Sequence, residues 1–206
     1  MSELSPCYAA RVAIEYKLIN TTFKSMGRLQ DVVDTAAGDG WVVHASGPFY
    51  TFLGREAGVT RHHQVARVLL HDTSWVIKLA DDRAKEGWTM SALGPSFAFF
   101  TRPTAPVETP PLRYHARGIA LLTPGGIRTL LRKEGRDGWK VRAMTAGNAL
   151  LEKPSAGANP VEHVLDGTLL RTAGMTERLL QERGEAGWRL TCASRLFLAF
   201  ARDIAD

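Results

Sequence analysis

Histidine and cysteine are the side chains best suited to bind a transition metal, and the chain has six histidines and two cysteines. The histidines are His44, His62, His63, His71, His115 and His163. His62 and His63 are the one adjacent pair, and neighbouring residues in a strand point to opposite faces. The sequence has no His-x-x-x-His and no Cys-x-x-Cys spacing. We therefore expect structural or surface histidines and no metal site.

Nucleophilic catalysis would need a serine, threonine or cysteine held beside a base, and the sequence has no Gly-x-Ser-x-Gly turn. Cys192 stands where three similar segments have alanine, which predicts a core position. The stretch Thr123-Pro124-Gly125-Gly126 could cradle a phosphate at a helix N-terminus, but it lacks the Lys-Ser/Thr of a Walker loop. We favour ordinary helix capping there, and we predict no catalytic residue and no cofactor.

Five basic residues in the second half of the chain are the candidate binding residues. Lys140, Arg142 and Arg189 fall on the more polar side of predicted strands, and Arg113 and Arg117 are near in sequence. A basic patch on one half of a protein is typical of sequence-tolerant nucleic-acid binding. Solvated surface charge explains these residues equally well, because the formal net charge of +5 is dispersed along the chain.

Four Gly-Trp pairs recur at nearly even intervals. They are Gly40-Trp41, Gly87-Trp88, Gly138-Trp139 and Gly187-Trp188, separated by 47, 51 and 49 residues. Self-similarity at a steady period indicates a repeat protein. The indoles could stack on bases or on a flat ligand, but their place in the strand alternation matches the apolar side. We therefore predict that they pack in the core.

A helix is predicted before each Gly-Trp pair. The twelfth, ninth and eighth residues before each tryptophan are mostly apolar, which is helical spacing. The fourth residue before it is always small, which predicts a close approach to another backbone: Ala37, Ala84, Gly135 or Gly184. The glycine of each pair suits a left-handed residue after the helix. The candidate N-caps or near-caps are Ser25, Thr73, Thr123 and Thr172.

Strands are predicted on both sides of each helix. From each tryptophan onward polar and apolar residues alternate, and a short turn then leads to a second apolar run such as FYTFL or SFAFF. That run is apolar on both sides, which indicates a strand buried on both faces. One more strand-like run precedes each helix. Each repeat thus predicts a βαββ unit of the α+β class, with one helix and an antiparallel three-stranded sheet in the order 1-3-2.

A proline-rich stretch divides the four repeats. Residues 103–111, PTAPVETPP, contain four prolines and predict a linker. An N-terminal pair of repeats is expected over 1–102, at about 9–56 and 61–102, and a C-terminal pair over 112–206, at about 112–154 and 161–203. We expect two pseudo-twofold halves, with a closed four-unit barrel as the alternative. One βαββ unit is near the lower size limit for an independent core, so another repeat or another chain must cover its open face.

The repeats resemble a small bacterial domain family of unknown function, whose members read strand, helix ending in Gly-Trp, strand pair and a closing basic residue. The resemblance rests on AKEGWTMSALGPSFAFFTRP from Ala84, with fainter copies from Ala36, Gly135 and Gly184. The closing basic residues are Arg55, Arg102, Lys153 and Arg202. This resemblance implies four tandem copies of the domain and no particular activity. The strand order also resembles that of dodecin, a flavin-binding oligomer, in topology alone.

The composition is that of a globular protein, with 45% hydrophobic residues. No stretch approaches the ~18 apolar residues of a membrane span, and the N-terminal segment lacks the basic start and apolar run of a signal peptide. Cys7 and Cys192 are far apart and favour free thiols in a reducing cytoplasm, with a single disulfide as the alternative. We therefore expect a cytoplasmic protein without a membrane partner.

The functional hypothesis is a non-enzymatic binding or scaffold protein whose surfaces are assembled from the four units. It would act on an unknown protein partner or through self-association. The alternative is a sequence-tolerant nucleic-acid-binding protein that uses the basic residues of the C-terminal half.

Overall fold

The computed structural model describes residues 14–22, 24–55, 60–105, 110–168 and 171–204. Four copies of a β-α-β-β unit follow one another in these residues. Units 1 and 2 comprise β1 (Glu15–Asn20), α1 (Met26–Gly38), β2 (Trp41–Ser46), β3 (Tyr50–Arg55), β4 (Arg61–Arg67), α2 (Thr73–Lys85), β5 (Thr89–Leu93) and β6 (Phe97–Pro103). Units 3 and 4 comprise β7 (Leu112–Gly118), α3 (Pro124–Arg136), β8 (Lys140–Met144), β9 (Asn148–Pro154), β10 (Val161–Gly167), α4 (Ala173–Glu185), β11 (Arg189–Ala193) and β12 (Phe197–Asp203).

Each unit forms its own antiparallel sheet with the third strand in the middle. The orders are β1-β3-β2, β4-β6-β5, β7-β9-β8 and β10-β12-β11. The central strands are buried on both faces, as Phe99 and Phe100 of β6 show. The predicted α+β class, the βαββ unit and the strand order 1-3-2 are therefore confirmed. Residues 9–13, 23 and 56 of the predicted first repeat and residues 106–109 of the predicted linker lie outside the described residues.

The helices begin and end at the signals in the sequence. Ser25, Thr123 and Thr172 accept a hydrogen bond from the backbone N–H three residues on, as N-caps do. In α2 the cap is Asp72, and Thr73, predicted as a cap or near-cap, is the first helical residue. The glycine before each tryptophan is left-handed, with φ of 79 to 81°. The chain can thus turn from helix into sheet without strain on a Cβ.

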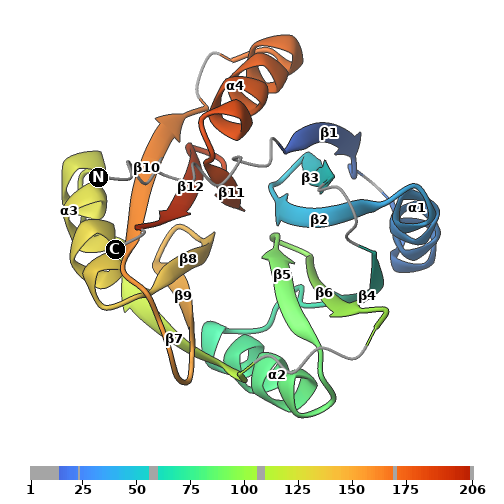
Figure 1. The fold of residues 1–206 in the computed structure, drawn as a ribbon, viewed down its shortest axis with the longest axis horizontal. Helices are drawn as coiled ribbons and strands as arrows, with labels where there is room; N and C mark the ends of the chain where they lie inside the picture. Colours follow the sequence, from blue (N-terminus) through green and yellow to red (C-terminus); the bar gives the residue numbers. More distant parts are fainter. Residues whose placement is uncertain (1–13, 23, 56–59, 106–109, 169–170, 205–206) are drawn as a thin grey trace, which may run out of the picture.

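The four units are joined in a closed ring, with the helices outside and the second strands around the centre (Figure 1). Each helix packs on the first strand of the next unit: α1 on β4, α2 on β7, α3 on β10, and α4 on β1. The second strands β2, β5, β8 and β11 contact one another in the same cyclic order. The expected division into two halves is not confirmed, because all four junctions use the same pair of elements. The arrangement is closer to the closed alternative, as a ring of four separate sheets.

The small residue near each helix end lies at these junctions. A Cβ on Gly135 would overlap the carbonyl oxygen of Val161, at the start of β10. A Cβ on Gly184 would come within 2.6 Å of the carbonyl oxygen of Ile14, just before β1. The predicted close approach of helix end and foreign backbone is confirmed at these two positions, and it is an approach between neighbouring units.

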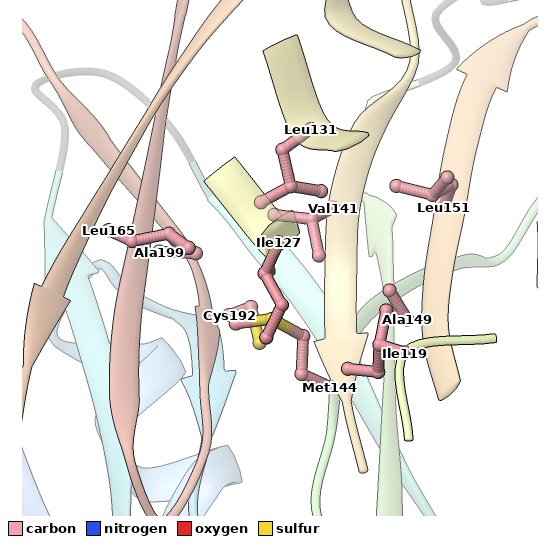
Figure 2. Packing of buried hydrophobic residues seen from close by; sticks show 10 residues of the cluster. All are labelled: Ile119, Ile127, Leu131, Val141, Met144, Ala149, Leu151, Leu165, Cys192 and Ala199. Atoms are coloured by element: carbon pink, nitrogen blue, oxygen red, sulfur yellow. The ribbon is translucent and has the colours of Figure 1, made fainter. Parts of the chain in front are cut away.

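The hydrophobic core is also shared between neighbours. It forms four clusters, and each combines the helix and sheet of one unit with strands of the next. In the cluster of Figure 2, Ile127 and Leu131 of α3 belong to unit 3, and Leu165, Cys192 and Ala199 belong to unit 4. Cys192 is buried and free, as predicted, and burial raises the pKa of its thiol to about 12. No unit therefore has a complete core of its own.

The tryptophans pack against these clusters, and each lies under the basic residue fourteen positions later. Trp188 is buried, and the other three rings are partly buried. The distances from the cationic group to the indole centroid are 4.4 to 4.8 Å, for Arg55 on Trp41, Arg102 on Trp88, Lys153 on Trp139 and Arg202 on Trp188. The predicted core packing is confirmed, and the closing basic residue of each repeat has a structural role as a cation over the ring.

One side chain from each first strand ties that unit to the one before it. The second strand is at the edge of its sheet, so part of its backbone has no partner within the unit. The main-chain N–H two residues after each tryptophan donates to a side chain of the following unit. The four bonds are Val43 to His63 Nε2 (3.2 Å), Met90 to the Tyr114 hydroxyl (3.3 Å), Val141 to His163 Nε2 (3.2 Å) and Leu190 to the Tyr16 hydroxyl (2.9 Å).

The acceptors alternate between tyrosine and histidine around the ring. Units 1 and 3 supply a tyrosine and units 2 and 4 a histidine, although all four junctions use the same elements. A histidine can accept this bond only when it is neutral. Burial lowers the pKa of His63 to about 4 and that of His163 to about 4, which keeps both in the accepting form near neutral pH. Burial also raises the pKa of Tyr114.

We predict that the free energy of unfolding falls as the pH is lowered from 7 to 4. An unfolded histidine takes up a proton below about pH 6.5, and folded His63 and His163 do so only near pH 4, so protons favour the unfolded chain in this window. The expected loss is about 3 kcal/mol for His63. His63→Tyr copies the neighbouring junctions and should make the decline shallower in urea titrations at pH 7 and 4.5. The reciprocal Tyr114→His should make it steeper, and equal slopes in all three proteins would contradict the assignment.

Candidate binding site at the centre of the ring

Each second strand carries a bulge, and the bulged residue is polar. The register shifts around the third residue after each tryptophan, which adds one residue to the second strand relative to its partner. A bulge of this kind re-aims the side chain it carries. The four bulged residues are His44, Ser91, Arg142 and Thr191, and all four line one pocket at the centre of the ring.

The third-strand residue that pairs with the residue two positions before each bulged residue differs among the four units. His44 lies against Gly54, where a Cβ would come within 2.7 Å of the imidazole. Arg142 pairs with Glu152. The other two positions hold Thr101 and Ala201, which also line the pocket. Equivalent positions in four similar units have thus diverged into four different pairs around one space.

The central pocket has a volume of about 830 Å³ and is lined by residues of all four units. Its charged lining residues are five cations, Arg61, Lys140, Arg142, Arg189 and Arg202, and three carboxylates, Glu152, Glu162 and Asp203. Three ion pairs join charged residues of the lining: Arg142 with Glu152, and Lys140 with Asp203 and Arg202 with Glu162, the last two at 2.7 Å. The cations exceed the carboxylates, so the pocket favours an anion.

The Arg142–Glu152 pair forms the deepest charged part of the wall. The side chains are 14% and 6% exposed, and an Arg142 nitrogen also donates to the Ser91 carbonyl at 2.8 Å. Burial alone would lower the pKa of Arg142, but the adjacent Glu152 carboxylate raises it overall. Arg142 Nε and Glu152 Oε2 are both buried and have no protein partner.

The pKa of His44 is affected by the cations of the pocket. Its pKa is lowered to about 3, first by burial and then by the positive charges of Arg142, Arg189 and Arg61. Its ring also meets that of Tyr16 edge to face, with 5.7 Å between centroids. His44 is therefore neutral near physiological pH and adds a polar but uncharged group to the wall.

The five basic residues singled out in the sequence separate into two groups. Lys140, Arg142 and Arg189 come together in the central pocket. Arg113 and Arg117 lie on β7 and do not line it; Arg113 is exposed, and Arg117 pairs with Glu134 at 2.7 Å. The sequence prediction did not include Glu152, Arg61 or His44. The repeat contains a signal for two of them, because His44 occupies the repeat position of the predicted Arg142, and Glu152 occupies that of Thr101, which is also polar. Glu152, Arg61 and His44 come from three different units, so only closure of the ring brings them together.

In the part of the chain that the structure describes, no three His, Cys, Asp or Glu side chains are grouped as metal ligands. The exposed large hydrophobic side chains of the described residues, Ile204 apart, lie near the hairpin turns and helix N-termini, with Leu70 97% and Leu121 98% exposed. No helix in the described ranges is both long and apolar enough to cross a membrane.

In comparisons with known proteins, no family model matches this chain, and neither a curated protein nor a solved structure matches it. The resemblance to a bacterial domain family of unknown function stays a prediction based on the Gly-Trp repeats.

We predict that Arg142 and Glu152 depend on each other energetically. Glu152→Thr alone leaves a buried guanidinium without its counter-ion and should lower the free energy of unfolding by about 3 kcal/mol. Arg142→Ser with Glu152→Thr recreates the Ser91 and Thr101 of unit 2 and should recover at least half of that loss. Urea unfolding of the wild type, both single variants and the double variant measures the coupling. Additive losses would show that the two charges act independently.

Proposed function

We propose that the protein is a non-enzymatic binding protein that takes a small anion into the central pocket. One observation carries the proposal: ring closure gathers a polar bulged residue from every unit, together with an excess of cations, around a space of about 830 Å³. This volume is typical of small-molecule sites. The site is formed from four units, so it exists only in the assembled ring.

The state of the titratable groups favours binding over catalysis. A general base works best with a pKa near the operating pH, and a thiol nucleophile needs a lowered pKa. In the described residues, His44 has a pKa of about 3, and the Cys192 thiol has one of about 12 within the core. Neither group suits acid–base or nucleophilic chemistry at neutral pH.

Nucleic-acid binding remains the second proposal, and the convergence of Lys140, Arg142 and Arg189 is what favours it. Two features weigh against it. Proteins that track a phosphate backbone present a row of accessible cations. Here Arg142 is buried and bound to Glu152, and Lys140 is bound to Asp203. A recess with few uncompensated charges suits a small anion better than a polymer.

Location and partners are part of the same proposal. The reducing cytoplasm stays a prediction from the sequence, because Cys192 is buried and free and Cys7 lies outside the described residues. A protein partner or self-association stays a prediction.

We expect inorganic phosphate, pyrophosphate or citrate to bind and to raise the melting temperature of the protein at low salt. Arg189→Ala removes a cation from the pocket and should weaken binding by about tenfold, since a charge-assisted hydrogen bond contributes about 1.5 kcal/mol or more. Arg113→Ala, at an exposed position of β7, is the matched control and should bind like the wild type. Calorimetric titration of the three proteins measures the dissociation constants.

Two outcomes would count against this proposal. Equal weakening by Arg189→Ala and Arg113→Ala would point to diffuse charge and not to the pocket. Tight, salt-dependent binding of single- or double-stranded oligonucleotides without small-anion binding would favour the second proposal.

A further inference from the structure

The turn before each helix has a large apolar residue at its third position. In each turn the main-chain N–H of the fourth residue donates to the carbonyl oxygen of the first, at 3.0 to 3.3 Å. The four turns are residues 21–24, 68–71, 119–122 and 168–171. In the sequence their third residues are Phe23, Leu70, Leu121 and Leu170. Glycine, asparagine, aspartate, serine and proline are the usual turn residues, so turn formation does not explain this choice.

The core does not explain it either. Leu70 and Leu121 are 97% and 98% exposed, and Phe23 and Leu170 lie outside the described residues. Leu70 also has a φ of 69°, a conformation that favours glycine or asparagine at this place in a turn. Because folding buries almost none of Leu70 or Leu121, both side chains are available to a partner.

The turns of all four units lie at the same end of the ring as the hairpin turns. In each unit the turn is bonded to the hairpin at 2.8 to 2.9 Å: Thr21 to the Phe49 carbonyl, Val68 to that of Ser96, Ile119 to that of Gly147 and Thr168 to that of Leu196. The four hairpins converge, because residues of every one line a single pocket. We name this end of the ring the hairpin face. Its other exposed large apolar residues are Met26, Phe49, Leu69, Trp75, Leu122, Met175 and Leu196.

The hairpin face has an excess of positive charge. In the described residues, its loops, hairpin turns and first helical turns contain one carboxylate, Asp72, which is the N-cap of α2. The cations in the same segments are Lys24, Arg28, Arg171 and Arg195. None of the four described helices has an acidic residue in its first turn, although such residues are favoured there. Both features attract a negatively charged partner.

The shape and the charge of this face together select the kind of partner. Two copies of the chain packed face to face would bring like charges together, which disfavours a dimer. A leucine that projects from a convex turn can be surrounded by fluid acyl chains, whereas a rigid protein would need a matching hollow for each one. Exposed apolar side chains among cations are typical of segments that bind the surface of an anionic bilayer.

We propose that the hairpin face binds the surface of an anionic lipid bilayer. Leu70 and Leu121 enter the boundary between headgroups and acyl chains, and the cations of the face contact the headgroups. The sequence predicts no membrane partner because no apolar run could span a bilayer, but binding to its surface requires no such run. The charged residues of the central pocket include Arg202 and Asp203, at the opposite end of the strands, so the two sites are separate.

Co-sedimentation with vesicles tests the proposal. The probes are vesicles of phosphatidylcholine alone and of phosphatidylcholine mixed equally with phosphatidylglycerol. The chain should bind the anionic vesicles at least about tenfold more tightly at low salt, since several cations lie near the lipid surface. The difference should shrink as the salt concentration is raised.

Substitutions on the two ends of the ring locate the binding surface. Leu70→Ser combined with Leu121→Ser should weaken binding to anionic vesicles by at least about tenfold, because two apolar side chains no longer enter the lipid. Its melting temperature should match the wild type, since both leucines are exposed. Ile204→Ser, 47% exposed at the opposite end, is the control and should bind like the wild type. Arg195→Glu should also weaken binding, and Arg136→Glu, in the last turn of α3, should not.

Three results would overturn the proposal. The first is no binding to either kind of vesicle, and the second is equal binding to both. The third is equal weakening by the leucine double variant and by Ile204→Ser. If sedimentation velocity instead shows a dimer that the leucine double variant dissociates, a second copy of the chain covers the hairpin face and the lipid proposal is wrong.

Discussion

The structure depends on satisfying the exposed edge of each second strand. In a three-stranded sheet ordered 1-3-2, the second strand leaves one side of its backbone without partners. Here an N–H on that edge is bound by a tyrosine or histidine of the next unit, next to the shared apolar cluster. Every unit has an unpaired edge on its second strand, and its first strand carries the tyrosine or histidine that binds the edge of the unit before it. The units can therefore be joined in one order only. Four additions return to the start, and the ring closes when Tyr16 binds Leu190.

Closure turns a repeated feature into a site. A bulged polar residue on one sheet would be an ordinary surface position. Four of them around a common centre define a pocket, and each unit is free to vary its contribution. His44 packs on glycine, Arg142 binds Glu152, and Ser91 and Thr191 bond to main-chain carbonyls. The residues that the four units share thus form the scaffold, and the residues that differ between the units give the pocket its polar and charged groups.

Much of this fold could be predicted from sequence because its signals are local. Glycine before tryptophan, the cap residues and the doubly apolar third strand depend on neighbours within one unit. The joining of units could not be predicted in the same way. Tyr16 and His63 do not look alike, yet they occupy equivalent positions and accept equivalent bonds. Likewise Lys140, Arg142 and Arg189 were singled out from their strand phase, whereas Glu152 pairs with Arg142 on the neighbouring strand of the same unit and was not singled out.

The most direct test of the closed ring compares two tyrosines that accept equivalent hydrogen bonds at different junctions. Tyr114→Phe removes an acceptor between units 2 and 3, and Tyr16→Phe removes the equivalent acceptor between units 4 and 1 while keeping the ring contact with His44. Urea unfolding should show that both substitutions lower the free energy of unfolding by a similar amount, about 1–2 kcal/mol. A loss for Tyr114→Phe with no loss for Tyr16→Phe would mean that the fourth junction is open.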